Sequence, residues 1–349
     1  MLSEIEGARR SVLLEFYSFS DDSAGRAVGA LLRRKAKEGV AVYLLYDSVG
    51  SISTDRKFFL ALAAAGVKVA EFRPVIYWKP YWNWIKRDHR KTVCVDGRCA
   101  FAGGFNITES DAPRSMGGRG WKDPSARVCG PAAAAIERLF WESWAASTPV
   151  DGKSSPALPV AEPGPAGNKR ALVLSAGGFR SVRSIRRSYV YAMERALDHI
   201  YITNAYFLPD KLVLRRLAAA ARRGVDVRII GPKETDHPYV RWAAWSAFGR
   251  LIKSGVKVYE WQGAILHSKT AVIDGTWSSV GSHNLDHRSL HYNLEVNVNV
   301  YDRSFGAALA RVFRDDLKNS KQVTLDDVRG RPLMAKAVSR LLYLFRSWA

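Results

Sequence analysis

The chain is poor in cysteine and has no long apolar run. Its three cysteines, Cys94, Cys99 and Cys129, are odd in number and lack the paired spacing of zinc sites. This pattern indicates neither a disulfide framework nor structural zinc, and we interpret the thiols as reduced, as in a cytoplasmic protein. No apolar stretch reaches the roughly 18 residues of a membrane span, and the amino terminus does not resemble a signal peptide. Any membrane attachment is therefore predicted to be peripheral.

Acidic residues are also in short supply. The 349 residues include 53 Lys and Arg against 33 Asp and Glu, a formal net charge of +20. Such an excess indicates a polyanionic partner, either nucleic acid or an anionic lipid surface, and charge alone does not choose between them. Because 47% of the residues are apolar, the chain can bury a large core, which excludes a disordered protein.

A proline-rich stretch divides the sequence. Residues 149–169 contain five prolines and no apolar period, which predicts an exposed linker. We expect a first half at 1–148, a second half at 170–320 and a basic segment at 321–349.

The two halves repeat the same order of predicted strands and helices. EFYSFSDD at 15–22 resembles TNAYFLPD at 203–210, and matching segments lie about 180 residues apart. Strands that alternate with helices predict an α/β fold of mixed, mostly parallel sheets with helices on both faces. The second half has an additional early strand at 171–175, which the first half lacks. This asymmetry predicts that the natural amino terminus lies upstream.

The repeat is clearest in two segments, DHRKTVCVDGRCAFAGGFN and LHSKTAVIDGTWSSVGSHN. Both fit H-x-K-x4-D-G-x5-G-[GS]-x-N without a gap. Six matched positions that occur twice, at corresponding places of two repeats, form a specific signal. The predicted site residues in these segments are His89, Lys91, Asp96, Gly104 and Asn106, and His267, Lys269, Asp274, Ser282 and Asn284.

The residue types of the motif suit phosphoryl transfer. Residues i and i+2 of a strand point to the same face, so each His stands beside its Lys. Imidazole serves as nucleophile or general acid near neutral pH, and Lys stabilises phosphate oxygens. Two such pairs would form one shared site that needs no metal or other cofactor: one His attacks phosphorus and the other protonates the departing alcohol. The lysines and the motif asparagines would hold the non-bridging oxygens.

Acidic residues are expected to play two different roles. Asp96 and Asp274 belong to the catalytic motif, but each precedes a Gly in a predicted hairpin turn, so we expect them to support structure. A nucleophilic His needs a carboxylate that orients its ring. Asp123 and Glu295 follow the two motifs at similar positions and are the candidates, although a solvent-exposed position is the alternative for Asp123.

The paired motifs, NAYFLPD and HRSLHYNLEVNVNVYD resemble the phospholipase D superfamily and, within it, bacterial cardiolipin synthases without amino-terminal transmembrane segments. The resemblance covers nearly the whole chain. It implies two similar α/β halves and transfer of a phosphatidyl group from phosphatidylglycerol to a second lipid, giving cardiolipin and glycerol through a covalent phosphohistidine. It also implies His89 as nucleophile and His267 as acid. Phosphatidylethanolamine is a further possible substrate.

Two flanking segments favour lipid over nucleic acid. Residues 74–87 place five aromatics among Lys79, Lys86 and Arg87, a composition suited to the headgroup level of a bilayer; the alternative is a core loop. The basic segment at 321–349 has an apolar face that includes Met334, Val338, Leu341, Phe345 and Trp348. It fits a helix on anionic lipid or one docked on the protein's own core.

We therefore predict a peripheral enzyme on the cytoplasmic face of a bacterial inner membrane. The competing class is a hydrolase or nuclease of the same superfamily, which would use the same histidines and suit the net charge of +20. Nucleic acid is the less favoured partner because of the aromatic segment beside the first motif.

Activity is expected to survive treatment with a chelator, because no group of Cys and His has metal-ligand spacing. An assay of phosphatidyl transfer with and without EDTA checks this expectation. Loss of activity that zinc restores would contradict it.

Overall fold

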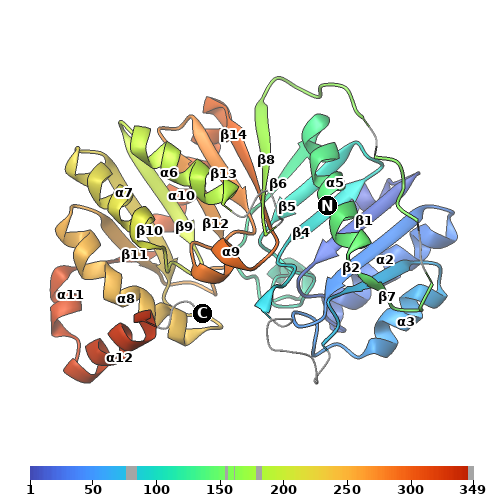
Figure 1. The fold of residues 1–349 in the computed structure, drawn as a ribbon, viewed down its shortest axis with the longest axis horizontal. Helices are drawn as coiled ribbons and strands as arrows, with labels where there is room; N and C mark the ends of the chain where they lie inside the picture. Colours follow the sequence, from blue (N-terminus) through green and yellow to red (C-terminus); the bar gives the residue numbers. More distant parts are fainter. Residues whose placement is uncertain (76–84, 154–155, 161, 178–182, 345–349) are drawn as a thin grey trace. The chain divides into compact units, whose positions relative to one another are not determined.

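The computed structural model describes residues 1–75, 85–153, 156–160, 162–177 and 183–344. The chain divides into two compact units (Figure 1). Unit 1 comprises Met1–Trp121, Ser125–Asn168 and Asn293–Val296, and unit 2 comprises Lys122–Pro124, Lys169–Tyr292 and Asn297–Ala349. Each unit therefore contains one short segment from the opposite half of the sequence.

Unit 1 is built on a seven-stranded sheet with the order β6-β5-β4-β1-β2-β3-β7. Its strands are β1 (Ser11–Phe16), β2 (Ala41–Asp47), β3 (Lys68–Phe72), β4 (Lys91–Val95), β5 (Cys99–Gly103), β6 (Ser125–Cys129) and β7 (Thr148–Pro149). Its helices are α1 (Leu2–Glu6), α2 (Ser23–Lys37), α3 (Arg56–Ala64) and α5 (Pro131–Ala145), with a 3-10 turn η1 at Arg114–Met116.

Local sequence explains the layers of unit 1. Every residue of β1 is buried, as expected for a strand covered on both faces. The carboxylate of Asp22 accepts a hydrogen bond from the Gly25 amide and begins α2, and Asp55 begins α3 in the same way. Helices α2 and α3 pack beside β2 and β3, whereas α5 packs across β1, β3, β4, β5 and β6.

Unit 2 repeats this plan with an eight-stranded sheet of order β15-β11-β10-β9-β12-β13-β14-β8. Its strands are β8 (Arg170–Ala176), β9 (His199–Asn204), β10 (Asp226–Pro232), β11 (Lys257–Trp261), β12 (Lys269–Ile273), β13 (Trp277–Gly281), β14 (Glu295–Tyr301) and β15 (Ser320–Val323). Its helices are α6 (Ser184–Arg195), α7 (Lys211–Arg222), α8 (Pro238–Lys253), α9 (His287–His291), α10 (Arg303–Lys318), α11 (Leu325–Gly330) and α12 (Leu333–Leu344).

The mixed sheets are as predicted, but the expectation that they are mostly parallel is wrong. In the described part of the chain, the parallel pairs within β1-β2-β3 and β9-β10-β11 are outnumbered by antiparallel pairs. The motif strands instead return through short hairpins, as from β4 to β5 and from β12 to β13, and a short hairpin can join only antiparallel strands. In the described part of unit 1, no strand lies beside β6 in the place that β8 takes beside β14.

The flanking segments differ in part from expectation. Residues 76–84, which hold the predicted aromatic cluster, lie outside the described residues. Arg87, assigned to the same lipid-facing segment, is 1% exposed and lies 3.5 Å from the Asp47 carboxylate, so its interfacial placement was wrong. A guanidinium paired inside the protein does not remain at a wet lipid surface.

The carboxyl-terminal segment docks on the protein's own core, which is one of the two predicted alternatives, and its contact with lipid stays a prediction. Helix α12 lies along α8, and Leu342 and Tyr343 pack against the core of unit 2. Leu333, Met334 and Leu341 are nevertheless exposed, while Phe345 and Trp348 lie outside the described residues. None of the helices that the structure describes has the length and apolar character needed to cross a membrane.

Candidate active site

Each motif places its lysine at the start of a central strand and its histidine just before that strand. Lys91 begins β4 and Lys269 begins β12. The Lys91 ammonium donates a hydrogen bond to the carbonyl oxygen of His89 over 2.7 Å, and Lys269 donates to the carbonyl oxygen of His267. The His and Lys of each motif therefore lie side by side, each pair within its own unit.

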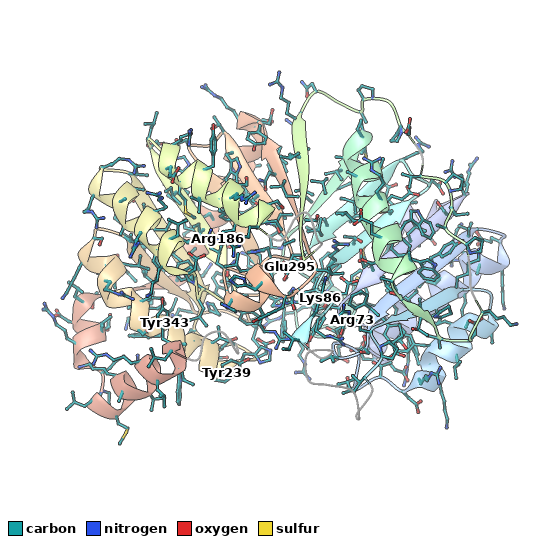
Figure 2. All side chains as sticks on the ribbon, in the orientation of Figure 1. Arg73, Lys86, Arg186, Tyr239, Glu295 and Tyr343 are labelled. Carbon is teal, nitrogen blue, oxygen red and sulfur yellow. The ribbon has the colours of Figure 1, made fainter. Side chains whose placement is uncertain are left out.

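In unit 1, the His89 ring contacts the carboxylate of Glu295. The distances from Nδ1 of His89 to Oε1 and Oε2 of Glu295 are 3.0 Å and 3.1 Å, and Glu295, labelled in Figure 2, is fully buried. The segment around Glu295 is held in place by backbone hydrogen bonds, from the His89 amide to Leu294 and from the Leu294 amide to Arg87. An ionised carboxylate can only accept, so Nδ1 is the donor in this contact, and Nε2 carries the lone pair whenever the imidazole is neutral.

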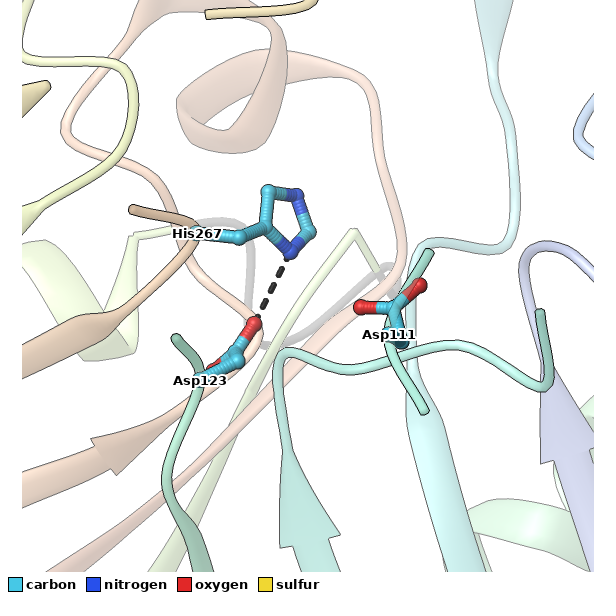
Figure 3. Close-up of side chains that lie close together, drawn as sticks. All are labelled: Asp111, Asp123 and His267. Carbon is cyan, nitrogen blue, oxygen red and sulfur yellow. Dashed lines mark hydrogen bonds and ion pairs between the residues drawn. The ribbon is translucent and has the colours of Figure 1, made fainter. Parts of the chain in front are cut away.

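In unit 2, the His267 ring contacts the carboxylate of Asp123 in the same way (Figure 3). Nδ1 of His267 lies 2.8 Å from Oδ2 of Asp123, and the two side chains are 5% and 1% exposed. Asp123 is thus buried and not at a solvent-exposed position. The His267 amide donates to the Lys122 carbonyl, and Lys269 Nζ lies 3.6 Å from the same Asp123 oxygen.

The acids pair crosswise with respect to sequence. Asp123 follows the first motif but contacts His267 of the second, whereas Glu295 follows the second motif but contacts His89. Each contact lies inside one unit, because Lys122–Pro124 belongs to unit 2 and Asn293–Val296 belongs to unit 1. Sequence position alone did not indicate this exchange.

The remaining motif residues follow the second strand of each hairpin. Gly104 comes directly after β5 and Ser282 directly after β13, and both are buried. The Asn106 side-chain oxygen accepts from the Ser18 amide over 3.2 Å, which ties it to the end of β1. Asn284 is 2% exposed, and its backbone amide donates a hydrogen bond to Ser289 Oγ. Their predicted contact with phosphate oxygens stays a prediction.

The motif aspartates occupy the predicted hairpin turns. Asp96 and Asp274 have φ angles of 54° and 51°, and the glycines that follow them have 66° and 61°. Two successive positive φ angles are typical of a type I′ turn, which explains the Asp-Gly pair. The carboxylate of Asp96 accepts from the amides of residues 9–11 at 2.7–3.2 Å, and that of Asp274 accepts from residues 197–199 at 2.9–3.0 Å. These carboxylates fasten the start of β1 and β9 to the motif hairpin, and their inclusion among the catalytic residues has no support in this geometry.

Asp96→Ala is expected to lower the free energy of unfolding by about 3 kcal/mol, since several hydrogen bonds to a charged acceptor are lost and Ala disfavours positive φ. Urea unfolding measures this loss, and Asp96→Asn, which tolerates the turn, should lose less. Burial raises the pKa of Asp96, but the amides of Ser11, Arg10 and Arg9 outweigh it and the pKa is lowered. The ionised Asp96 carboxylate therefore stabilises the folded state at a pH above the pKa of Asp96 in the unfolded chain. This stabilisation is lost as the pH falls below about 4. Equal acid sensitivity of wild type and Asp96→Asn would contradict this.

A buried charged network surrounds the first motif and was missed from sequence. Glu15 and Asp88 are 0% and 1% exposed, and Arg90 Nη1 lies 3.6 Å from Glu15 and 3.0 Å from Ser143 Oγ. Burial, and then the Glu15 carboxylate, raise the pKa of Asp88 well above its usual range. Asp88 therefore holds its proton to a higher pH than an exposed aspartate does.

The second motif lacks this network. The positions that match Glu15, Asp88 and Arg90 in the repeat are Thr203, Leu266 and Ser268. The two histidines therefore have similar carboxylate partners, but the residues at these three matched positions are charged in unit 1 and uncharged in unit 2. This difference in charge at matched positions is the sequence signal that could have revealed the buried network.

An aromatic ring lies against each motif histidine, which the sequence did not lead us to expect. Tyr17 lies with its ring centroid 5.1 Å from that of His89, and the Lys91 ammonium is 5.0 Å from the Tyr17 ring. Tyr206 lies 6.0 Å from the His267 ring and donates to Asp236 over 2.7 Å. Tyr17 follows β1 and Tyr206 follows β9, the strands that pair with β4 and β12, which places each tyrosine at the end of the sheet where the motif strand begins.

Comparison with known proteins identifies the family of the chain. The family model described as cardiolipin synthase, PLD-like domain, matches residues 1–116 and 189–317. The chain belongs to this family. The major cardiolipin synthase ClsA of Bacillus subtilis (strain 168) is 34% identical over 345 residues, which cover 98% of this chain and 72% of the relative. Cardiolipin synthase A of Pseudomonas putida (strain GB-1) is 33% identical over 330 residues, covering 94% of this chain and 68% of the relative.

Solved structures share the fold at low identity. The phosphatidylserine synthase of Haemophilus influenzae Rd KW20 matches with a TM-score of 0.76 at 12% identity, covering 99% of this chain and 91% of that chain. A polyphosphate kinase from Porphyromonas gingivalis matches with a TM-score of 0.60 at 15% identity, covering 100% of this chain and 53% of that chain. The predicted fold class, two phospholipase D-like α/β halves with mixed sheets and flanking helices, is confirmed.

Proposed function

We propose that this chain is a cardiolipin synthase-type phosphatidyltransferase that moves a phosphatidyl group between phospholipids through a covalent phosphohistidine. The observation that carries the proposal is the pair of histidine–carboxylate contacts, His89 with Glu295 and His267 with Asp123. Each histidine depends on an acid from the opposite half of the sequence, so neither half alone can orient its own imidazole. Two equally prepared imidazoles suit a reaction that needs one nucleophile and one acid.

The reaction proceeds in two displacements at phosphorus. Neutral His89 attacks the phosphorus of phosphatidylglycerol with Nε2, the bond to the headgroup glycerol oxygen breaks, and His267, which starts as the imidazolium, donates its Nε2 proton to this oxygen. The hydroxyl of a second phosphatidylglycerol then attacks the phosphohistidine, His267 accepts its proton, and His89 departs as neutral imidazole. The products are cardiolipin and glycerol, and both histidines return to their initial protonation states.

The lysines and asparagines stabilise the charge that develops on phosphate. Lys91 and Lys269 carry ammonium groups beside the two histidines. Their positive charge offsets the negative charge of the non-bridging oxygens in the transition state. Asn106 and Asn284 follow the motif hairpins and would add hydrogen-bond donors, with Gly104 and Ser282 allowing close approach of the backbone. The reaction as written uses no cofactor.

The lipid role is preferred to phosphodiester hydrolysis of nucleic acid. The paired histidines serve either reaction, and a net charge of +20 suits either polyanion. The cardiolipin synthases that match over nearly the whole chain favour a lipid substrate. We place the enzyme peripherally on the cytoplasmic face of a bacterial inner membrane, where its basic surface would meet anionic lipid.

The test incubates the purified protein with phosphatidylglycerol, alone and with phosphatidylethanolamine, and identifies the products by mass spectrometry. Cardiolipin and glycerol are expected from phosphatidylglycerol alone. A parallel assay with plasmid DNA separates the two classes of enzyme. Cleavage of the plasmid without any new phospholipid would overturn the proposal, and release of phosphatidic acid alone would make the protein a hydrolase.

A further inference from the structure

A basic cavity of about 520 Å³ lies in unit 2 and is lined by residues outside the two H-x-K motif segments. Helix α6, the start of α7 and the short helix α9 form its walls. Arg186, labelled in Figure 2, is one of its cations. The charged and titratable residues of the lining, apart from Asp210, are Arg183, Arg186, Lys211, Arg215, His287 and His291.

The one acid of this lining is already engaged. Asp210 forms an ion pair with Arg186, and its carboxylate accepts from the amides of Leu212 and Val213 at 2.8 Å and 3.0 Å to cap α7. Among the described residues, no hydrogen bond or ion pair involves the side chains of Arg183, Lys211 or Arg215. Three cations therefore face the cavity without a neutralising partner in the described part of the chain, an arrangement suited to a bound anion.

Two imidazoles complete the wall. The rings of His287 and His291 lie with centroids 4.2 Å apart. Burial and then the charge of Arg183 lower the pKa of His291; Asp210 opposes this and Arg186 adds to it. A phosphate group in the cavity would offset the two arginines and raise that pKa, so His291 reports on anion binding.

A second hollow adjoins the cavity and shares Lys211 and Arg215 with it. This groove, about 400 Å³ in volume, runs between α7 and α8. Its apolar residues are Leu214, Ala218, Ala247 and Leu251, and its other charged residues are Arg222 and Arg250. An apolar floor with only cationic charges beside it fits a molecule that is both anionic and apolar.

We propose that this cavity and groove form a binding site for an anionic phospholipid, with the phosphate in the cavity and part of an acyl chain in the groove. Arg183 and Arg215 contact the phosphate, since guanidinium groups match its geometry. None of the lining residues belongs to the two H-x-K motif segments or is one of the carboxylates that contact the motif histidines, so the site is additional to the reaction proposed above. Free phosphate shares the head-group chemistry but would leave the groove unused.

The test follows the His291 imidazole by NMR in the full chain, with its signals assigned from His291→Gln. The probes are monomeric dihexanoylphosphatidylglycerol, dihexanoylphosphatidylcholine and inorganic phosphate, added to His89→Ala protein so that no turnover occurs. Phosphatidylglycerol is expected to raise the pKa of His291 in a saturable manner. It should bind more tightly than inorganic phosphate, because of the groove, and more tightly than the zwitterionic lipid.

Two double variants with equal loss of charge distinguish binding at this site from general electrostatic attraction between the lipid and the positively charged protein. Arg183→Gln with Arg215→Gln should weaken phosphatidylglycerol binding roughly thirtyfold, which corresponds to about 1 kcal/mol for each arginine beside an anionic lipid. Arg187→Gln with Arg311→Gln, which lie outside both hollows, should change it less than about twofold. Equal weakening by the two pairs, no response of His291, or equal affinity for phosphate and lipid would overturn the proposal.

Discussion

The variants His89→Ala and His267→Ala should each form cardiolipin about 10⁴-fold more slowly than the wild type, or slower still. His89→Ala removes the nucleophile and His267→Ala removes the acid. The fold should remain intact, since neither imidazole forms part of the hydrophobic core. Initial rates of cardiolipin formation by mass spectrometry give the measurement, and circular dichroism and urea unfolding check the fold.

A matched control uses a histidine outside both motifs. His199 contacts Asp198 and stacks on Tyr201, and His199→Ala should retain near wild-type activity. Substantial activity in purified His89→Ala or His267→Ala would exclude a mechanism that needs both imidazoles. Activity restored by mixing the two inactive proteins would show that the two histidines need not come from one chain.

Neutralising the orienting acids should also have a large effect. Glu295→Gln and Asp123→Asn keep the shape of each side chain but remove the charge that holds Nδ1 protonated, and an amide can donate to Nδ1 and fix the wrong tautomer. We expect kcat to fall about 10³–10⁴-fold, with a smaller change in KM, since substrate contacts are retained. Steady-state kinetics over a range of phosphatidylglycerol concentrations separates the two effects.

Glu260→Gln is a suitable control, because this acid pairs with Arg241 at 2.9 Å and with neither motif histidine. It should leave kcat nearly unchanged. If Glu295→Gln behaved like this control, the contact with His89 would not serve catalysis. A rise in KM with kcat unchanged would instead assign Glu295 to substrate binding.

The sequence predicted those features that depend on local spacing. The alternation of strands and helices, repeated in both halves, identified the fold class, and the Asp-Gly pairs identified the two motif hairpins. The odd separation of Asp96 from His89 also indicated that this acid acts on structure. Such inferences succeed because strand period and turn conformation are set by neighbouring residues.

Features that depend on distant contacts could not be predicted in this way. Asp123 and Glu295 were recognised as acids that could orient a histidine, but their crosswise pairing requires each half to contribute a segment to the other unit. The burial of Arg87 beside Asp47 was missed because a charged residue in an aromatic stretch gives no local sign of a buried partner. The same holds for the Glu15–Asp88 pair, whose members lie more than seventy residues apart in sequence.

A motif histidine should carry the phosphatidyl group during turnover. Protein mixed briefly with phosphatidylglycerol labelled with ³²P should be quenched in alkali, which preserves phosphohistidine, then digested and analysed by mass spectrometry. An acid-labile phosphatidyl adduct is expected on His89, and it should disappear when excess unlabelled phosphatidylglycerol is added, with the label passing to cardiolipin. An adduct on His267 would reverse the assigned roles, and turnover with no adduct on either histidine would contradict the mechanism.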